Sequence, residues 1–244
     1  ALDKMTGAEI WRYGTSKEQG YSPPTIIEAG GVRQLILLRP DAVTSIDPDT
    51  AKEYWSVPYE ATSGSIIMSP VVVGEYLYAA GYSSKSLLLK LHADKPAVDE
   101  VWRDQARSAI SPVNVQPIVD GNTIFGLDQK GPLAALEIPS GKRLWEKNLG
   151  LPIRASPTAA GGKVFVVTID GRFYCLSGLD GSEVWSVRGL PQTASLILNV
   201  SPAVEGDLVV VPYPSGDVVA LKISDGTPVW SENLSRTRSS SQLA

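Results

Sequence analysis

Short runs of apolar residues alternate with polar, glycine-rich turns along the whole chain of 244 residues. The runs are rich in Val, Ile, Leu and Tyr, and their length and composition are those of β-strands rather than helices. Five runs follow a glycine at a similar distance and are predicted to be equivalent strands: Leu35–Leu38, Tyr76–Ala79, Thr123–Phe125, Val164–Val167 and Leu208–Val211. The pattern predicts an almost purely β protein, with helix in less than about a tenth of the residues.

Tryptophan recurs at a nearly constant interval. The six tryptophans are Trp11, Trp55, Trp102, Trp145, Trp185 and Trp230, which lie 44, 47, 43, 40 and 45 residues apart. In five of the six units, Thr, Ser or Asp stands five residues before the tryptophan, and Gly or Ala stands four residues before it. The unit that contains His92 is two residues longer and lacks the glycine. A fixed period of this length indicates a repeat architecture.

A proline dipeptide marks the start of each complete unit. It occurs as Ser22-Pro23, Ser69-Pro70, Gln116-Pro117, Ser156-Pro157 and Ser201-Pro202. We expect the dipeptide inside the first strand of each unit. That strand would be the innermost one, and its free edge faces the central channel, so a proline without a backbone N–H breaks no hydrogen bond between strands. Glycine turns, the apolar strand, a third strand and a fourth strand with the tryptophan complete the unit. Four strands in 40 to 47 residues are typical of a β-propeller blade.

The motif before each tryptophan resembles the pyrroloquinoline-quinone (PQQ)-like repeat, the tryptophan-docking motif of a family of β-propellers. Ala135-Leu136-Glu137, followed by Ser140-Gly141 and Trp145, is one example. The resemblance covers nearly the whole chain. It implies that each tryptophan packs between adjacent blades, where a large flat side chain fills the gap between twisted sheets.

The predicted fold is all-β, a propeller of four-stranded antiparallel blades in a single domain over residues 1–244. Five complete blades are expected at 22–60, 66–104, 111–149, 154–189 and 196–234, with a partial blade at 1–14 and a tail or closing strand at 235–244. A sixth blade split between the termini would remove free strand edges, although no second strand is evident for it. The alternative is a piece of a seven- or eight-bladed ring, whose open blade edges would permit self-association.

Composition and charge disfavour several classes of function. The net charge of −4 offers no basic face for a nucleic acid. No apolar run approaches the roughly 18 residues that a transmembrane segment needs. Cys175 is the single cysteine and His92 the single histidine, so the sequence contains neither an internal disulfide nor a pair of imidazoles. The chain starts at Ala1 without a signal peptide or a lipid-attachment cysteine, and we expect a mature form or an excised piece.

Quinone-dependent oxidation is the main enzymatic alternative, because PQQ dehydrogenases resemble these repeats. That resemblance implies a longer, eight-bladed ring with a calcium site, a catalytic aspartate and a tryptophan beneath the quinone. All six tryptophans here occupy repeat positions, and Asp47-Pro48-Asp49-Thr50 lacks the glycine and the terminal glutamate of a calcium loop. We therefore predict a protein that is not an enzyme and that has no catalytic residue, cofactor or metal.

From about residue 147 onward the chain resembles the BamB family, propeller scaffolds of bacterial outer-membrane protein assembly. Three segments carry this similarity: Leu149–Pro157, Asp180–Trp185 and Pro228–Thr237. The resemblance implies a protein-interaction scaffold in the periplasm or at the inner face of the outer membrane. The alternatives are an engineered or recombined propeller without a native activity and a fragment of a PQQ-dependent dehydrogenase.

The same resemblance implies partner-binding residues. The family has a Leu-x-Leu-Arg segment that touches a BamA-type periplasmic domain, and Leu151, Ile153 and Arg154 match its two apolar positions and its basic position. Asn199 and Ile197 fall where the family has acidic residues, and both depart from that pattern. We expect the segment from 149 to 155 to be exposed at one rim of the ring. The alternative is that its apolar residues only anchor a loop between blades.

Overall fold

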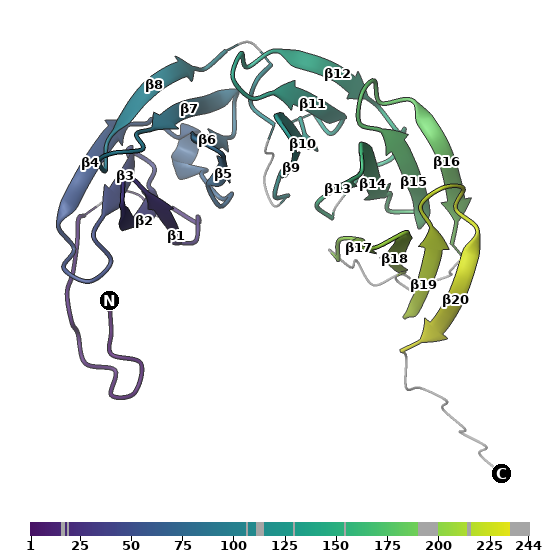
Figure 1. The fold of residues 1–244 in the computed structure, drawn as a ribbon, viewed down its shortest axis with the longest axis horizontal. Coiled ribbons are helices and arrows are strands. Elements are labelled where there is room, and N and C mark those ends of the chain that lie inside the picture. Colours follow the sequence, from purple (N-terminus) through teal and green to yellow (C-terminus); the bar gives the residue numbers. More distant parts are fainter. Residues whose placement is uncertain are drawn as a thin grey trace. The chain divides into compact units, whose positions relative to one another are not determined.

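The structure is a computed structural model that describes residues 1–15, 18, 20–105, 107–110, 115–128, 130–153, 155–189, 200–213 and 216–234. Its strands form five four-stranded antiparallel sheets (Figure 1). Among the described residues, Thr62–Gly64 is the single helical element, one 3₁₀ turn. The prediction of an almost purely β protein is confirmed. The chain divides into two compact units, Ala1–Lys147 and Asn148–Ala244.

The first unit contains three sheets, and in each of them the strands are hydrogen-bonded in sequence order. The first sheet consists of β1 (Thr25–Ala29), β2 (Val32–Leu38), β3 (Ala42–Ile46) and β4 (Glu53–Pro58). The second consists of β5 (Val71–Val73), β6 (Tyr76–Gly81), β7 (Lys85–Leu91) and β8 (Val98–Arg103). The third consists of β9 (Ile118–Asp120), β10 (Thr123–Leu127), β11 (Leu133–Glu137) and β12 (Arg143–Lys147). We call these sheets blades 1, 2 and 3.

The second unit contains two sheets of the same order, which we call blades 4 and 5. Blade 4 consists of β13 (Thr158–Ala160), β14 (Lys163–Val167), β15 (Arg172–Ser177) and β16 (Glu183–Arg188). Blade 5 consists of β17 (Ala203–Glu205), β18 (Leu208–Pro212), β19 (Asp217–Lys222) and β20 (Pro228–Asn233). All twenty named strands belong to these five sheets, and the predicted β-propeller fold is confirmed.

Each unit has its own apolar core. In the first unit, side chains from all three blades join one cluster, with Ile36, Leu88 and Ile124 among its fully buried members. In the second unit, Phe165 and Phe173 stack with ring centroids 6.0 Å apart and pack in one cluster with Val209. The predicted apolar strands β2, β6, β10, β14 and β18 supply much of these cores.

The proline dipeptides do not lie inside the first strands, and that prediction is wrong. β5, β9, β13 and β17 begin directly after the proline, because a residue without an N–H cannot take part in the ladder as a donor. The residue before the proline instead links neighbouring blades. Ser22 Oγ donates to the carbonyl of Met68 at 2.7 Å. Gln116 accepts from the backbone N–H of Ser69 at 2.9 Å and donates to its carbonyl at 3.1 Å.

The predicted sixth blade stays a prediction. Within Ala1–Tyr13, the described residues form a turn closed by an isolated bridge between Leu2 and Glu9, without a named strand. The tail 235–244, which was expected to supply a closing strand, lies outside the described residues.

The tryptophans dock onto the turn between the third and fourth strands of a neighbouring blade. The indole N–H of Trp102 donates to the carbonyl of Ile138 at 3.2 Å, and that of Trp185 donates to the carbonyl of Ile223 at 3.0 Å. Trp11 makes the same contact to Pro48 at 3.1 Å. Buried tryptophan N–H groups need such a partner. The family's implied packing of tryptophan between blades is therefore observed within each unit.

The docked indole explains the repeated glycine. A Cβ on Gly141 would lie 2.9 Å from a ring carbon of Trp102, and a Cβ on Gly226 would lie 2.7 Å from a ring carbon of Trp185. Both glycines also have a positive φ, of 67° and 75°. A side chain at either position would therefore meet the indole as well as strain the backbone.

Trp55 has a different acceptor, because the turn between the third and fourth strands of blade 2 lacks the motif. Its indole N–H donates to Gln34 Oε1 of its own blade at 2.9 Å. The same oxygen accepts the Ser45 hydroxyl at 2.6 Å, and Gln34 Nε2 donates to the carbonyl of Ala29 at 2.9 Å. Gln34 is 1% exposed. A buried glutamine thus replaces the carbonyl of the neighbouring blade as the partner of this tryptophan.

The turn between β7 and β8 of blade 2, which is longer than in the other units, packs tightly against the β1–β2 turn of blade 1. A Cβ on Gly30, in the β1–β2 turn, would lie 2.1 Å from the carbonyl oxygen of Lys95. A Cβ on the adjacent Gly31 would meet no atom within 4 Å. The close approach of the blade 2 backbone therefore requires a glycine at position 30, whereas it places no such requirement on position 31.

Candidate functional site

The segment predicted to bind a partner lies in the second unit, directly before blade 4. Leu151 is 43% exposed, whereas Ile153 is 7% exposed. Ile153 forms an isolated antiparallel bridge with Thr168, and the carbonyl of Pro152 accepts the backbone N–H of Ile169 at 3.0 Å. The segment is thereby held against the turn between β14 and β15.

The expectation that the whole segment 149–155 is exposed is wrong at Ile153 and Ala155, which are both buried. Side chains alternate between two faces along an extended segment, so the bridge that turns Ile153 inward leaves Leu151 outward. The exposure of Leu151 agrees with a role in partner binding. The burial of Ile153 agrees with the alternative, in which the residue only anchors the loop between blades. Arg154 and Asn199 lie outside the described residues.

A neighbouring turn extends the exposed apolar surface. Ile169 is 46% exposed and follows the bridge residue Thr168. The Thr168 hydroxyl donates to Asp170 Oδ1 at 2.6 Å, and the carbonyl of Thr168 accepts the N–H of Gly171 at 2.9 Å, so the turn is well ordered. We call Leu151, Pro152 and Ile169 the apolar rim.

Charged side chains flank the apolar rim. Arg188 lies 3.7 Å from Asp170, and the guanidinium of Arg172 lies 5.5 Å from the centroid of the Tyr174 ring. Partial burial acts to raise the pKa of Asp170, but hydrogen bonds from the Thr168 hydroxyl and from the backbone prevail and lower that pKa below its ordinary value. The rim is therefore an apolar strip beside an ionised carboxylate and two exposed arginines.

Sequence reasoning missed Ile169 and the two arginines. A signal was present, because an isoleucine in the polar turn Ile169-Asp170-Gly171 has no obvious place in a core. Its proximity to Pro152 could not be read from the sequence, because it depends on the short bridge of Ile153 to Thr168.

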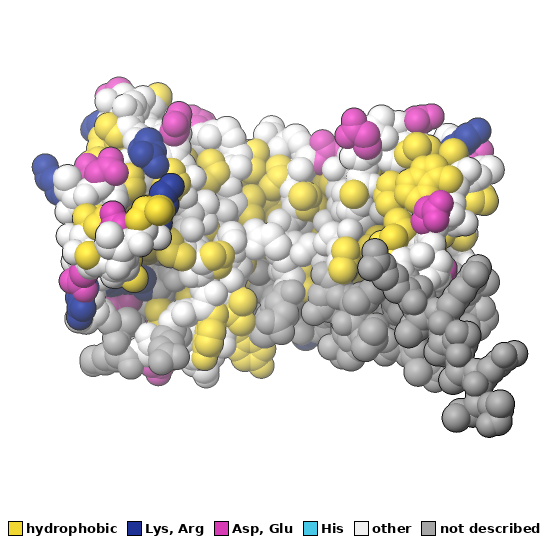
Figure 2. Space-filling view, turned by 90° about the horizontal axis from the view of Figure 1, so that it is seen from below, with side chains coloured by type: hydrophobic (Ala, Val, Ile, Leu, Met, Phe, Trp, Pro, Cys, Tyr) yellow, Lys and Arg dark blue, Asp and Glu magenta, His cyan; other side chains and the backbone are white. Residues whose placement is uncertain are grey.

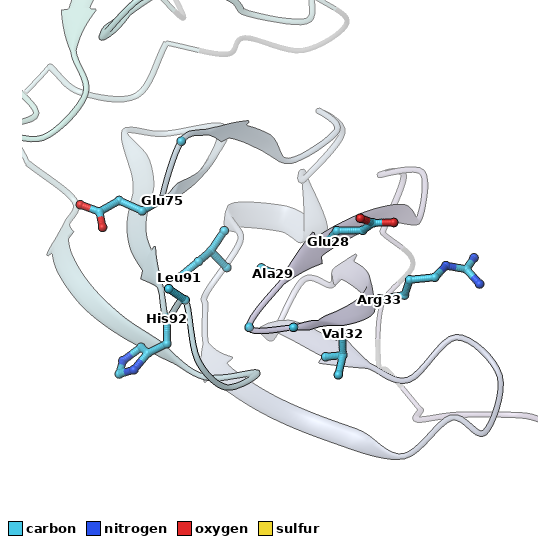
Figure 3. A pocket seen from close by; sticks show the side chains of 11 residues that line it. Glu28, Ala29, Val32, Arg33, Glu75, Leu91 and His92 are labelled. Atoms are coloured by element: carbon cyan, nitrogen blue, oxygen red, sulfur yellow. The ribbon is translucent and has the colours of Figure 1, made fainter.

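The first unit contains a pocket of about 630 Å³ between the β1–β2 turn and the edge of blade 2 (Figure 3). Figure 3 shows Glu75 and His92 pointing away from the turn that carries Ala29 and Val32. His92 Nε2 lies 2.9 Å from Asp99, and Glu75 pairs with Lys90 at 3.2 Å. The turn also contributes the charged side chains of Glu28 and Arg33, which Figure 3 shows extending to the side away from Glu75 and His92. The pocket therefore lacks a convergent set of free polar groups.

Candidate catalytic and metal-binding groups are dispersed. Within the described ranges, no group of three or more His, Cys, Asp or Glu side chains is placed to hold a metal ion. Cys175 is fully buried, and burial raises the pKa of its thiol to about 11. The part of the chain that the structure describes contains no helix that is long and apolar enough to cross a membrane.

Solved structures share the fold. BamB from Moraxella catarrhalis superposes with a TM-score of 0.66 at 17% identity, covering 96% of this chain and 66% of that one. A europium-containing methanol dehydrogenase superposes with a TM-score of 0.63 at 9% identity, covering 86% of this chain and 50% of that one. Identities this low bear on the fold alone.

Curated relatives are similar in sequence. The outer membrane protein assembly factor BamB of Burkholderia pseudomallei is 30% identical over 168 residues, which are 68% of this chain and 42% of the relative. That of Nitrosomonas eutropha is 25% identical over 189 residues, 78% of this chain and 44% of the relative. The chain thus spans less than half the length of these relatives.

The family model described as outer membrane protein assembly factor BamB matches residues 1–115 and 92–244, which together cover the whole chain. The confirmed four-stranded blades and the docked tryptophans agree with that match. The chain belongs to the BamB family of outer membrane protein assembly factors.

Proposed function

We propose that the chain is a protein-interaction scaffold that acts in outer-membrane protein assembly, without catalysis, in the periplasm or at the inner face of the outer membrane. The family match supports the process. The observation that carries the proposal is the apolar rim, because two large aliphatic side chains, Leu151 and Ile169, are 43% and 46% exposed beside arginines on a well-ordered turn. Exposed apolar side chains with neighbouring arginines are typical of interface anchors.

The proposed partner is a BamA-type periplasmic domain that contacts the apolar rim. Leu151 supplies the central apolar contact and Ile169 extends it. Ile153 acts as the anchor that fixes the segment to Thr168. Arg172 and Arg188 favour an acidic rim on the partner, because complementary charge steers association. We keep Arg154 and Asn199 in the proposed surface as the family resemblance implies.

The test is a binding titration with an isolated BamA-type periplasmic domain. Serine at both rim positions, Leu151→Ser with Ile169→Ser, should raise the dissociation constant about 30-fold or more, because interface anchors contribute about 1–2 kcal/mol each. The matched control is Leu179→Ser, since Leu179 lies in the same unit and is 86% exposed. That control should bind like the unchanged chain.

Ile153→Ala separates anchoring from contact. Ile153 is buried, so its truncation should lower the free energy of unfolding by about 2–4 kcal/mol. The double serine variant should instead melt within a few degrees of the unchanged chain. Equal affinities of the double variant and the Leu179→Ser control would contradict the proposed surface. Absence of binding by the unchanged chain at high micromolar concentration would contradict the proposed partner.

A further inference from the structure

An ion pair on the fourth strand closes the boundary between blades 1 and 2. Arg103 pairs with Glu100 of the same strand at 2.6 Å, and it also donates to the carbonyl of Pro58 in blade 1 at 2.9 Å. The two charged residues lie one position after and two positions before the tryptophan of β8. In the sheet they pair with Leu87 and Leu89, and both leucines are fully buried. The ion pair thus lies beside the apolar third strand at this boundary.

Blade 3 has the same arrangement with the two charges exchanged. Arg143 lies two positions before the tryptophan of β12, pairs with Glu146 at 2.9 Å, and donates through Nε to the carbonyl of Arg107 at 2.9 Å. The arginine also pairs with Asp128 at 3.0 Å, and its side chain is 7% exposed. Ala134, which pairs with Glu146 in the sheet, is fully buried. Two carboxylates and a carbonyl therefore hold one buried guanidinium between blades 2 and 3.

Blade 5 has no charged residue at these two positions. Pro228 lies two positions before the tryptophan of β20 and pairs with Leu221 in the sheet. Ser231 lies one position after that tryptophan and pairs with Val219. Val219 is only half-buried, whereas its counterparts in blades 2 and 3 are fully buried. The boundary between blades 4 and 5 thus lacks an ion pair at these positions, and its third strand is partly uncovered.

A pocket of about 250 Å³ lies at this boundary. Its lining comes from both blades and includes Val187, Tyr213, Val219, Leu221, Pro228 and Ser231. The ring of Tyr213 packs against the end of blade 4, because a Cβ on Gly189 would lie 2.6 Å from two of its ring carbons. The pocket is therefore a largely apolar recess between two blades of one unit. It lies where an ion pair fills the corresponding boundaries of the first unit.

The charged residues that line the pocket already have partners. Asp217 accepts a hydrogen bond from Asn233 Nδ2 at 2.6 Å, and Arg188 lies 3.7 Å from Asp170. Burial raises the pKa of Tyr213 to about 12, so its hydroxyl is neutral at physiological pH. A guanidinium in this pocket would find one lining carboxylate, where blade 3 offers two, and would lie near another arginine. Because burying a charge without compensation is costly, the pocket favours a neutral group.

The size and the walls of the pocket fit one aromatic ring. An apolar cavity of about 150 Å³ can take up benzene. A pocket of about 250 Å³ therefore has room for a ring and for the atoms that attach it. Val187, Val219 and Leu221 offer aliphatic contacts, and the ring of Tyr213 offers an aromatic one. Aromatic side chains in desolvated pockets are common anchors of protein interfaces.

The pocket lies directly beside the apolar rim. Gly189, which lines the pocket, donates its backbone N–H to the carbonyl of Gly171 at 3.0 Å. Gly171 belongs to the turn that carries Ile169 of the rim, and a Cβ on Gly171 would lie 3.9 Å from the ring of Tyr213. One partner can therefore contact the rim and fill the pocket.

We propose that the pocket between blades 4 and 5 receives one neutral aromatic side chain of the partner that contacts the apolar rim. The ring packs against Tyr213 and Leu221, and it takes the place that Arg143 and Glu146 fill in blade 3. This inference rests on the proposed function, because it adds a second contact by the same partner.

Two small molecules probe the pocket of the unchanged chain. Benzyl alcohol represents an aromatic side chain, and ethylguanidinium represents an arginine. Each is titrated into the chain labelled at its valine and leucine methyl groups, and NMR spectra are recorded. Benzyl alcohol should shift the signals of Val187, Val219 and Leu221 saturably, with a Kd on the order of millimolar for so small a ligand. Ethylguanidinium should leave these signals in place.

Hydrophobic side chains are also exposed elsewhere on the second unit. Trp230 lies on the other face of β20 and is 43% exposed, and Figure 2 shows hydrophobic side chains gathered on the C-terminal unit. Benzyl alcohol bound there would shift the indole N–H signal of Trp230 and not the methyl signals of the pocket. The spectra therefore separate the two faces.

Two variants fill the pocket from within the chain. Ser231→Phe supplies a ring, and Pro228→Arg with Ser231→Glu copies the ion pair of blade 3. Each should abolish the shifts that benzyl alcohol causes at the pocket. Each should also raise the Kd for an isolated BamA-type periplasmic domain about tenfold or more. The matched control is Ser224→Phe, because Ser224 is exposed on the same blade outside the pocket lining, and it should behave like the unchanged chain.

Three results would overturn the inference. The pocket methyl signals of the unchanged chain show no saturable shift with benzyl alcohol, or they shift equally with ethylguanidinium, or both filled variants bind the periplasmic domain as tightly as Ser224→Phe. The proposed function survives each of them if Leu151→Ser with Ile169→Ser still weakens binding of the domain. Failure of the unchanged chain to bind the domain, with benzyl alcohol bound in the pocket, would instead contradict the proposed partner.

Discussion

Replacing Gln34 by methionine tests whether a buried glutamine substitutes for the missing docking turn of blade 2. Methionine has nearly the same length and fills the same space, but it can neither accept the Trp55 indole N–H nor donate to Ala29. The Ser45 hydroxyl loses its acceptor as well. The variant thus removes three hydrogen bonds with little change of volume.

The expected loss of stability comes from the hydrogen-bond donors that stay buried without an acceptor. Trp55 is 9% exposed and Ser45 is fully buried, so both donors are left without a partner. An unsatisfied buried polar group costs about 1–3 kcal/mol. The carbonyl of Ala29 is half-buried and can be hydrated in part. We expect Gln34→Met to lower the free energy of unfolding by about 2–5 kcal/mol.

A double-mutant cycle with Trp55→Phe isolates the indole contribution. Phenylalanine has no N–H, so combining it with Gln34→Met should cost about 1–2 kcal/mol less than the sum of the two single changes. The assay is equilibrium urea unfolding followed by circular dichroism and fluorescence. Gln105→Met is the control, because Gln105 is exposed and its change should stay within about 0.5 kcal/mol.

The reasoning is refuted if Gln34→Met is no more destabilising than Gln105→Met. A coupling energy near zero between positions 34 and 55 would refute the narrower claim that the glutamine serves the tryptophan. In that case the indole N–H would have to find another acceptor, such as a water.

Three further predictions concern local chemistry. Gly30→Ala should destabilise blade 1 by several kcal/mol more than Gly31→Ala in thermal melts, because both have a positive φ and only the first would overlap a neighbouring carbonyl. The Cys175 thiol, with its pKa raised to about 11, should react with a thiol reagent at pH 8 only as fast as the protein unfolds, and rapid labelling of the native chain would contradict this. Hydrogen bonds from Ser182 lower the pKa of Asp180, so its stabilising effect is present above the unfolded pKa of about 4 and is lost as the pH falls through the folded pKa. When the unfolding midpoint is measured at decreasing pH, the loss of stability should be smaller in Asp180→Asn than in the unchanged chain.

The fold was predictable because its signals are local and repeated. The tryptophan period predicted repeated four-stranded blades, and the glycine before each apolar run placed β2, β6, β10, β14 and β18 within a few residues. The proline dipeptides were predicted to lie inside the first strands, whereas they lie directly before them. Where a strand begins depends on which backbone groups pair with the next strand, and the residue types alone do not specify that pairing.

The candidate site was predictable only in part. The family pattern led to Leu151, which is exposed, but it could not separate Leu151 from the buried Ile153. The separation depends on one bridge to Thr168, a residue from the next hairpin. The acceptor of Trp55 was hidden for a related reason. Gln34 is 21 residues away in the chain, and its role exists only because the neighbouring turn departs from the repeat.

The docking contact also sets where blades of this family can be exchanged by recombination. Each contact has its indole in one blade and its glycine in another, as for Trp102 and Gly141. A crossover between such a tryptophan and glycine separates two residues that must match, whereas a crossover directly after a blade that carries its own acceptor separates none. Blade 1, in which Gln34 serves Trp55, is therefore a blade whose successor could be replaced without a compensating change at the tryptophan.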